Sequence, residues 1–207
     1  MMPKAKNVEE YIAMHQAGIA ANPDCGTSHY NLAVGLIGQK KFDEAERELQ
    51  AAIDCSPSLA EAYVQLGGIC LKRGDLDGCL AYNKQATKAR AGFFEGFGNI
   101  GFVHLQRGEV EEAIASLKKA ISFNSKFIQA HSTLASAYLM SGLIDESIET
   151  NLKVIELGPD FAVAYNNLAI AYLEKGDYDK AVENCDKATK LGYEVAPEIL
   201  KQIDKYR

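Results

Sequence analysis

Five hydrogen-bonding side chains recur in this sequence at a constant interval of 34 residues: Asn31, Gln65, Asn99, Thr133 and Asn167. We call this set the amide column. A carboxamide carries both a donor and an acceptor, so such a column can bond the N–H and C=O groups of an extended peptide. These contacts involve only the peptide main chain and need no particular peptide sequence. The alternative is that each amide hydrogen-bonds to a neighbouring helix and serves only the fold.

Residues typical of catalytic and metal sites occur in the chain, but not at the spacing that those sites require. The four histidines are scattered, and there is no nucleophile elbow, zinc-protease motif or phosphate-binding loop. Acidic clusters such as "FDEAERE" at 42–48 are typical of solvated first turns of helices, where carboxylates interact favourably with the helix dipole. The sequence therefore predicts a non-catalytic protein with no cofactor and no metal site.

The composition argues against several classes of partner. A formal net charge of −6 and a pI near 5.3 disfavour nucleic acid, which is bound mainly through basic residues, and an anionic membrane surface. No segment approaches the roughly 20 apolar residues that span a bilayer, and no apolar stretch typical of a secretory signal follows the start. We therefore expect a cytoplasmic protein without direct membrane insertion, although a leader already removed would leave no trace here.

The elements that must position the amide column repeat with the same period. A large apolar residue follows each column member: Leu32, Leu66, Ile100, Leu134 and Leu168. The next position is small in every unit: Ala33, Gly67, Gly101, Ala135 and Ala169. A position later in each unit is also small: Ala45, Cys79, Ala113, Ser147 and Ala181. Since large side chains would hold two closely crossing helices apart, these columns predict a pair of packed helices in each unit. Glycine recurs between the two helices, except where Lys40 replaces it in the first unit.

The period predicts one domain over residues 1–207, built from repeats at 26–59, 60–93, 94–127, 128–161 and 162–195. Residues 7–21 fall in phase with a second helix and predict an N-terminal half-repeat, while 197–207 predict a C-terminal capping helix. Tyr11 stands where every full repeat has a small residue, so it fits only where no partner helix abuts it. Val8, Tyr11 and Ile12 should then form an apolar face that is a candidate interface.

The five cysteines, an odd number with no CxxC pair, argue against a zinc site and against a disulfide framework. We therefore expect reduced, buried thiols that pack as small apolar side chains. Cys70 and Cys79 fall on the two facing helices of one repeat. A disulfide or redox pair between these two residues is the alternative interpretation.

This pattern resembles the tetratricopeptide repeat (TPR) family, whose unit is a helix-turn-helix of 34 residues. The match lies at the large–leucine–small positions, the small pair and the closing prolines: Tyr63, Leu66, Gly67, Tyr165, Leu168, Ala169, Ala113, Ala120, Pro57 and Pro159. The resemblance implies an all-α fold, a right-handed α-solenoid of five repeats whose first helices line a concave groove. It places the amide column in that groove, with Tyr30, Phe102 and Ile170 beside it.

The resemblance also implies an adaptor or scaffold that binds a protein or peptide partner in the groove. The expected ligand is a neutral or mildly apolar peptide or helix, because only four of thirty groove positions are charged: Glu61, Lys72, Glu95 and Glu174. Relatives that capture the C-terminal carboxylates of chaperones use lysine, asparagine and arginine at fixed positions. Those positions here hold Tyr30, Val34, Gln65, Glu95 and Asn99, which argues against chaperone tails. The alternative function is a structural subunit, able to form a homo-oligomer or to dock through its ends or convex face onto a larger complex.

Overall fold

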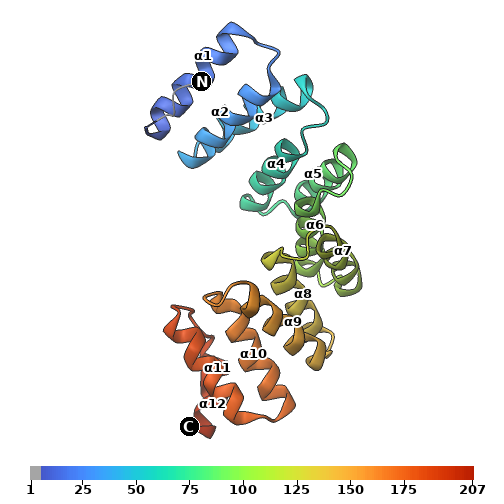
Figure 1. The fold of residues 1–207 in the computed structure, drawn as a ribbon, viewed down its shortest axis with the longest axis vertical. Coiled ribbons are helices and arrows are strands. Elements are labelled where there is room, and N and C mark those ends of the chain that lie inside the picture. Colours follow the sequence, from blue (N-terminus) through green and yellow to red (C-terminus); the bar gives the residue numbers. More distant parts are fainter. Residues whose placement is uncertain (1–5) are drawn as a thin grey trace. The chain divides into compact units, whose positions relative to one another are not determined.

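The computed structural model describes residues 6–207. Within that range the chain forms twelve α-helices and one short 3-10 helix, without any strand (Figure 1). The all-α helical-repeat fold predicted from the sequence is confirmed. The chain divides into two compact units, one ending at Asn99 and one beginning at Ile100, so each unit is described separately. The single-domain organisation stays a prediction.

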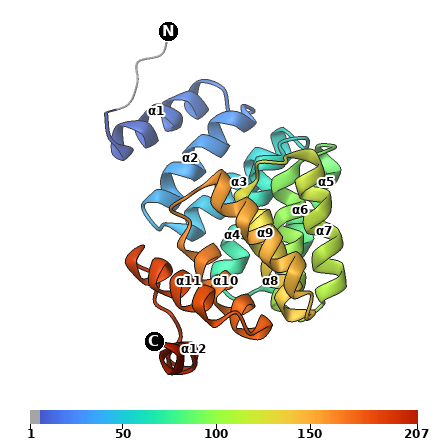
Figure 2. The ribbon, with the colours of Figure 1, turned by 60° about the horizontal axis from the view of Figure 1, so that its bottom comes forward.

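The first unit is a stack of helix hairpins. Its helices are α1 (Val8–Ala21), α2 (Gly26–Gly38), α3 (Phe42–Cys55), α4 (Ala60–Lys72), α5 (Leu76–Ala89) and the first half of α6 (Phe94–Gln106). α1 packs on α2, α2 pairs with α3, and α4 pairs with α5. Figure 2 shows α1 lying beside α2, with the chain reversing direction between them. Contacts between α3 and α4 join the two hairpins into one stack.

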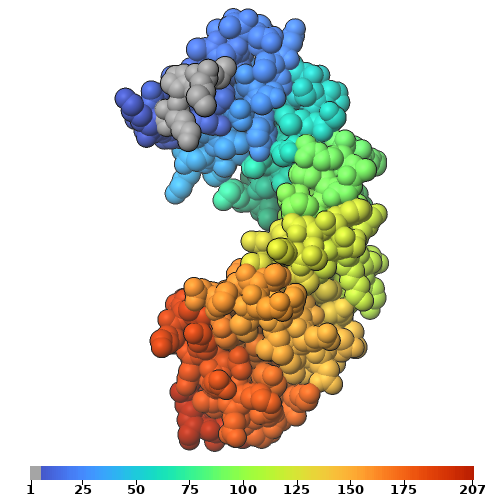
Figure 3. Space-filling model, in the orientation of Figure 1, coloured from blue at the N-terminus to red at the C-terminus, as the bar shows by residue number. Residues whose placement is uncertain are grey.

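The second unit continues the same hairpin architecture. After the remainder of α6 it contains α7 (Val110–Phe123), α8 (Ile128–Met140), α9 (Ile144–Leu157), α10 (Ala162–Lys175), α11 (Tyr178–Lys190), α12 (Pro197–Ile203) and a 3-10 helix (Asp204–Tyr206). α8 pairs with α9, α10 pairs with α11, and α12 folds back onto α11. Ile203 is fully buried in a cluster with Cys185, Ala188 and Val195, so the C-terminal residues pack directly against the unit (Figure 3).

Small residues allow the two helices of each hairpin to approach closely. A Cβ atom added to Gly67 of α4 would lie 2.5 Å from Nδ2 of Asn83 in α5. One added to Gly101 of α6 would lie 2.5 Å from Cγ of Leu117 in α7. Real Cβ atoms do not tolerate such distances, so a Cβ at either of these two crossings would force the helices or the partner side chain to shift.

The turn within each full repeat uses a left-handed residue. Gly74, Gly108, Gly142 and Gly176 have φ between 71° and 79°. Lys40 takes the same role in the first repeat with φ of 61°. A side chain in this conformation costs about 1–2 kcal/mol, so the first turn is less favourable than the other four.

At the N-terminal end, α1 rests on a glycine of α2. Tyr11 and Ile12 are half-buried, and a Cβ atom on Gly35 would meet Ile12 Cγ1 at 2.7 Å. Val8 is 37% exposed and lies one helical turn away. Of the three residues predicted to form an apolar interface, Tyr11 and Ile12 therefore contribute to the contact between α1 and α2, while Val8 faces solvent. Their role as an interface stays a prediction.

Two further features concern the whole of residues 6–207. No helix in this range is both long and apolar enough to cross a bilayer. All five cysteines lie within it and are free thiols: Cys25, Cys55, Cys70, Cys79 and Cys185. Cys70, Cys79 and Cys185 are buried, as expected for cysteines that act as small apolar side chains. The expectation is wrong for Cys55, which is exposed, and Cys25 is only half-buried.

Candidate functional site

One amide of the column in the first unit already has a partner within the protein. Asn99 Nδ2 donates to Oδ1 of the buried Asn83 over 2.9 Å. Gln65 acts on the Tyr30 hydroxyl and lowers its pKa, against the larger effect of burial. Asn31 is half-buried on α2. The column is therefore part of a hydrogen-bond network as well as a surface feature.

The orientation of the Asn99 amide follows from its partner. Asn83 Nδ2 donates to the main-chain oxygen of Cys79 over 2.8 Å, and a carbonyl oxygen can only accept. The Asn83 side chain must therefore turn its Oδ1 toward Asn99, and Asn99 must donate. Asn99 keeps its own carbonyl oxygen and its second N–H for a ligand.

Hydrogen bonds within the protein also fix the orientation of the column members in the second unit. Thr133 Oγ1 donates to the Gln129 main-chain oxygen over 2.8 Å, so its hydroxyl oxygen can only accept from a ligand. Asn167 Nδ2 donates to Ser136 Oγ over 3.1 Å. The Ser136 proton is already used on the Ser132 main-chain oxygen, which forces Asn167 to donate and leaves its carbonyl oxygen available. Asn167 is only 7% exposed.

A polar cluster surrounds the column in the first unit. We define the α4–α6 polar cluster by six residues that contact or influence one another: Tyr30, Glu61, Gln65, Arg90, Glu95 and Asn99. Arg90 donates to both carboxylate oxygens of Glu61, over 2.6 and 2.7 Å. Burial alone would raise the pKa of Glu61, but these bonds outweigh it and hold that pKa below its usual range.

Two aromatic side chains, Tyr30 in this cluster and Phe93 beside it, have distinct roles. Burial raises the pKa of Tyr30, and the negative charge of Glu61 raises it further, so the phenol stays neutral. The guanidinium of Arg90 lies 5.0 Å from the ring centroid of Phe93, which is buried beneath it. This cation–π contact holds Arg90 against the surface while it binds Glu61.

The apolar residues predicted to line the groove are partly accessible. Phe102 on α6 and Ile170 on α10 are both half-buried. Val34 on α2 is 37% exposed and Met140 at the end of α8 is 59% exposed. Each unit therefore presents apolar side chains near its column members, as a neutral or mildly apolar ligand would require.

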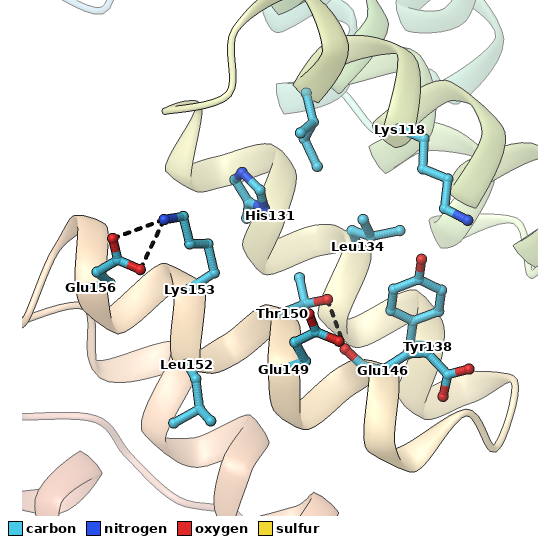
Figure 4. Close-up of a pocket in the computed structure, with 11 residues that line it drawn as sticks. Lys118, His131, Leu134, Tyr138, Glu146, Glu149, Thr150, Leu152, Lys153 and Glu156 are labelled. Atoms are coloured by element: carbon cyan, nitrogen blue, oxygen red, sulfur yellow. Dashed lines mark hydrogen bonds and ion pairs between the residues drawn. The ribbon is translucent and has the colours of Figure 1, made fainter.

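A cleft of about 570 Å³ lies in the second unit between α7, α8 and α9 (Figure 4). Its walls combine apolar and charged side chains: Lys118, Ile121, His131, Leu134, Tyr138, Glu146, Glu149, Thr150, Leu152, Lys153 and Glu156. Lys118 Nζ lies 5.7 Å from the Tyr138 ring centroid. Lys153 Nζ bonds both carboxylate oxygens of Glu156 at 2.8 Å.

Sequence reasoning did not find this cleft, because it followed the first helix of each repeat and the cleft is built largely on the second helix, α9. One signal was present. Leu152 is 50% exposed, and its counterparts in the other repeats are polar or charged: Gln50, Lys84, Lys118 and Asp186. An apolar residue at an otherwise polar, solvent-facing position marks a candidate contact surface.

Comparison with known protein families gives matches along most of the chain. A tetratricopeptide repeat family model matches residues 12–60 and 30–92, a TPR repeat model matches 101–142, and a further tetratricopeptide repeat model matches 162–191. The chain is 32% identical over 77 residues to the TPR repeat-containing thioredoxin TTL4 of Arabidopsis thaliana. That match covers 37% of this chain and 11% of TTL4, so the chain spans about a tenth of the length of this curated relative.

Solved structures share the fold. YrrB, described as a TPR protein with an unusual peptide-binding site, is 21% identical, with 92% of this chain and 97% of YrrB covered and a TM-score of 0.71. The protein MamA is 26% identical, with 77% of this chain and 94% of MamA covered and a TM-score of 0.67. The repeat positions, the helix hairpins and these matches agree: the chain belongs to the tetratricopeptide repeat family.

Proposed function

We propose that this protein is a non-catalytic adaptor whose first helices bind a neutral or mildly apolar segment of a partner protein, either extended or helical. TPR proteins typically bind protein or peptide partners, and their repeats are typically non-catalytic interaction modules. The acidic net charge of −6 argues against nucleic acid and an anionic membrane surface as partners. The lysine and arginine residues with which some relatives capture the C-terminal carboxylates of chaperones are absent from the corresponding positions here, which argues against that class of ligand.

One observation carries this proposal. Asn99 and Asn167 each use one N–H to fix the amide against a neighbouring helix. Each keeps a carbonyl oxygen and a second N–H, the pair of groups that the main chain of a bound segment needs. The internal bonds hold the amides in place before binding, which lowers the entropy that must be lost on association.

The test compares the double variant Asn99→Ala/Asn167→Ala with wild type. A partner captured by the full chain and identified by mass spectrometry supplies the ligand, and its affinity is measured by calorimetry. Losing two ligand hydrogen bonds should weaken binding by about 5- to 100-fold. Asn184→Ala is the matched control, because Asn184 bonds only the main-chain oxygen of Lys180 on the second helix α11. Equal affinities for wild type, control and double variant would contradict the proposal.

A second candidate function is structural: docking onto a larger complex, or self-association, through the second helices or the ends. The cleft between α7 and α9 favours it, because exposed Leu152 lies in that cleft. Multi-angle light scattering of wild type, Leu152→Lys and Tyr11→Ser tests self-association. An oligomer that dissociates in either variant supports it, and a monomeric wild type removes the self-association form of this function.

A further inference from the structure

We propose that Glu95 and Asn99 form a subsite for one cationic side chain, a lysine or an arginine, of the segment bound by the first unit. This inference rests on the proposed function and deepens it. It predicts that the otherwise neutral ligand carries a single positive charge at a defined position.

The two residues are placed to act together. They lie four residues apart in the first turns of α6, which follows α5 in the first unit (Figure 1). Residues with this spacing occupy the same face of a helix, one above the other. A group bound to the Glu95 carboxylate is therefore also within reach of the Asn99 side chain.

Glu95 lacks a donor for part of its carboxylate. Its Oε2 atom is shielded from solvent and, among the described residues, has no hydrogen-bond partner. A buried acceptor without a donor is unfavourable, and a charged one more so. The residue as a whole is only half-buried, so part of this side chain lies at the protein surface, where a ligand can approach it.

The neighbouring cation does not satisfy Glu95. Both terminal nitrogens of Arg90 donate to Glu61, and the guanidinium is held over the Phe93 ring. Glu95 acts on Arg90 only through space, by its negative charge. Glu61, Arg90 and Glu95 together carry a net charge of −1, so this surface attracts one further cation.

Asn99 adds a second acceptor of fixed orientation. Since one N–H of its Nδ2 donates to Asn83, its carbonyl oxygen is left to accept from a ligand, beside the second N–H. An ammonium has three donors and a guanidinium five, so either can bond the Glu95 carboxylate and this oxygen at the same time. A ligand carboxylate brought to the same place would be repelled by the like charge of Glu95.

The experiment selects ligands from random peptides, so the natural partner need not be identified first. A phage library of random 12-residue peptides is selected on the immobilised full-length protein, in parallel with the isosteric variant Glu95→Gln. Wild type should enrich peptides with lysine or arginine at one position, and Glu95→Gln should enrich peptides without that preference. Glu44→Gln is the control, because Glu44 is an exposed first-turn glutamate of α3 whose loss changes the net charge equally.

A selected peptide then gives a double-mutant cycle by fluorescence anisotropy. Glu95→Gln should weaken the lysine-containing peptide at least fivefold, and weaken its lysine-to-norleucine version less than twofold. Peptides selected without any basic preference, or equal losses for both peptides, would overturn the subsite and leave the proposed function standing. Failure of wild type to enrich any peptide would overturn both.

Discussion

Two buried asparagines occupy the same repeat position but differ in their hydrogen bonds, and this difference gives a sharp stability prediction. Asn83 in α5 and Asn151 in α9 are both 0% exposed. Asn83 has partners for both ends of its amide. Asn151 Nδ2 donates to the Ser147 main-chain oxygen over 3.0 Å, but its Oδ1 has no partner within the described residues. Leucine occupies this position in the first and third repeats, at Leu49 and Leu117.

The expected magnitudes follow from those contacts. A buried carbonyl without a donor costs about 1–3 kcal/mol, and Asn151→Leu removes it and adds apolar burial, against the loss of one hydrogen bond to Ser147 worth about 1 kcal/mol. We expect this variant to raise the free energy of unfolding by about 2 kcal/mol. Asn83→Leu gains similar burial but loses two hydrogen bonds worth about 1 kcal/mol each, so its net change should be near zero. The fully buried Leu49, in a repeat that has Ala33 where the repeat of Asn151 has Ala135, shows that a leucine fits this position beside alanine.

The assay is urea unfolding followed by circular dichroism, with native-state hydrogen exchange to locate the change. Exchange is needed because repeat proteins can open in parts rather than as one unit. Slower exchange in α9 and α10 should accompany Asn151→Leu, with a rise in melting temperature of about 4–8 °C. Asn151→Ala is the control, because it removes the same carbonyl but leaves a cavity. If Asn151→Leu is no more stable than Asn83→Leu, the reasoning from the unpaired oxygen is refuted.

Further variants test the turns, one ion pair and one helix crossing. Lys40→Gly should stabilise the protein by about 1 kcal/mol and Gly142→Ala should destabilise it by about as much, because both residues have positive φ. Thermal melts in which the two variants do not shift the melting temperature in opposite directions would contradict this. Burial lowers the pKa of His29, but its bond to Glu48 at 2.6 Å outweighs this and raises the pKa overall. The stabilisation of the folded state by protonated His29 is therefore complete below about pH 6.5 and is lost as pH rises through the raised pKa. The difference in urea midpoint between wild type and His29→Gln should shrink as pH rises from about 5.5 to 8.5. Gly67→Ala should cost about 1–3 kcal/mol in urea unfolding, because the added Cβ would lie 2.5 Å from the buried amide of α5; an unchanged midpoint would show that the helices can separate.

Much of the fold could be predicted because it depends on local and periodic features. The constant interval of 34 residues places the first helices, which begin at Gly26, Ala60, Phe94, Ile128 and Ala162. Small residues at fixed positions indicate where helices cross, since steric exclusion depends mainly on side-chain size. The turn position was also identifiable, including the exception at Lys40, because the left-handed conformation strongly favours glycine.

The candidate sites were only partly predictable. The sequence by itself determined that hydrogen-bonding side chains, four of them amides, recur at one position of the five repeats, and that the positions predicted to line a groove carry few charges. It left open whether those amides are free or serve the fold, and the tertiary structure assigns one N–H of Asn99 and of Asn167 to the fold. Only the tertiary structure decided the unpaired oxygen of Glu95, the contrast between Asn83 and Asn151, and the cleft beside Leu152. The reason is physical: periodicity depends on residue size and polarity, whereas a hydrogen bond depends on distance and angle between atoms from different helices.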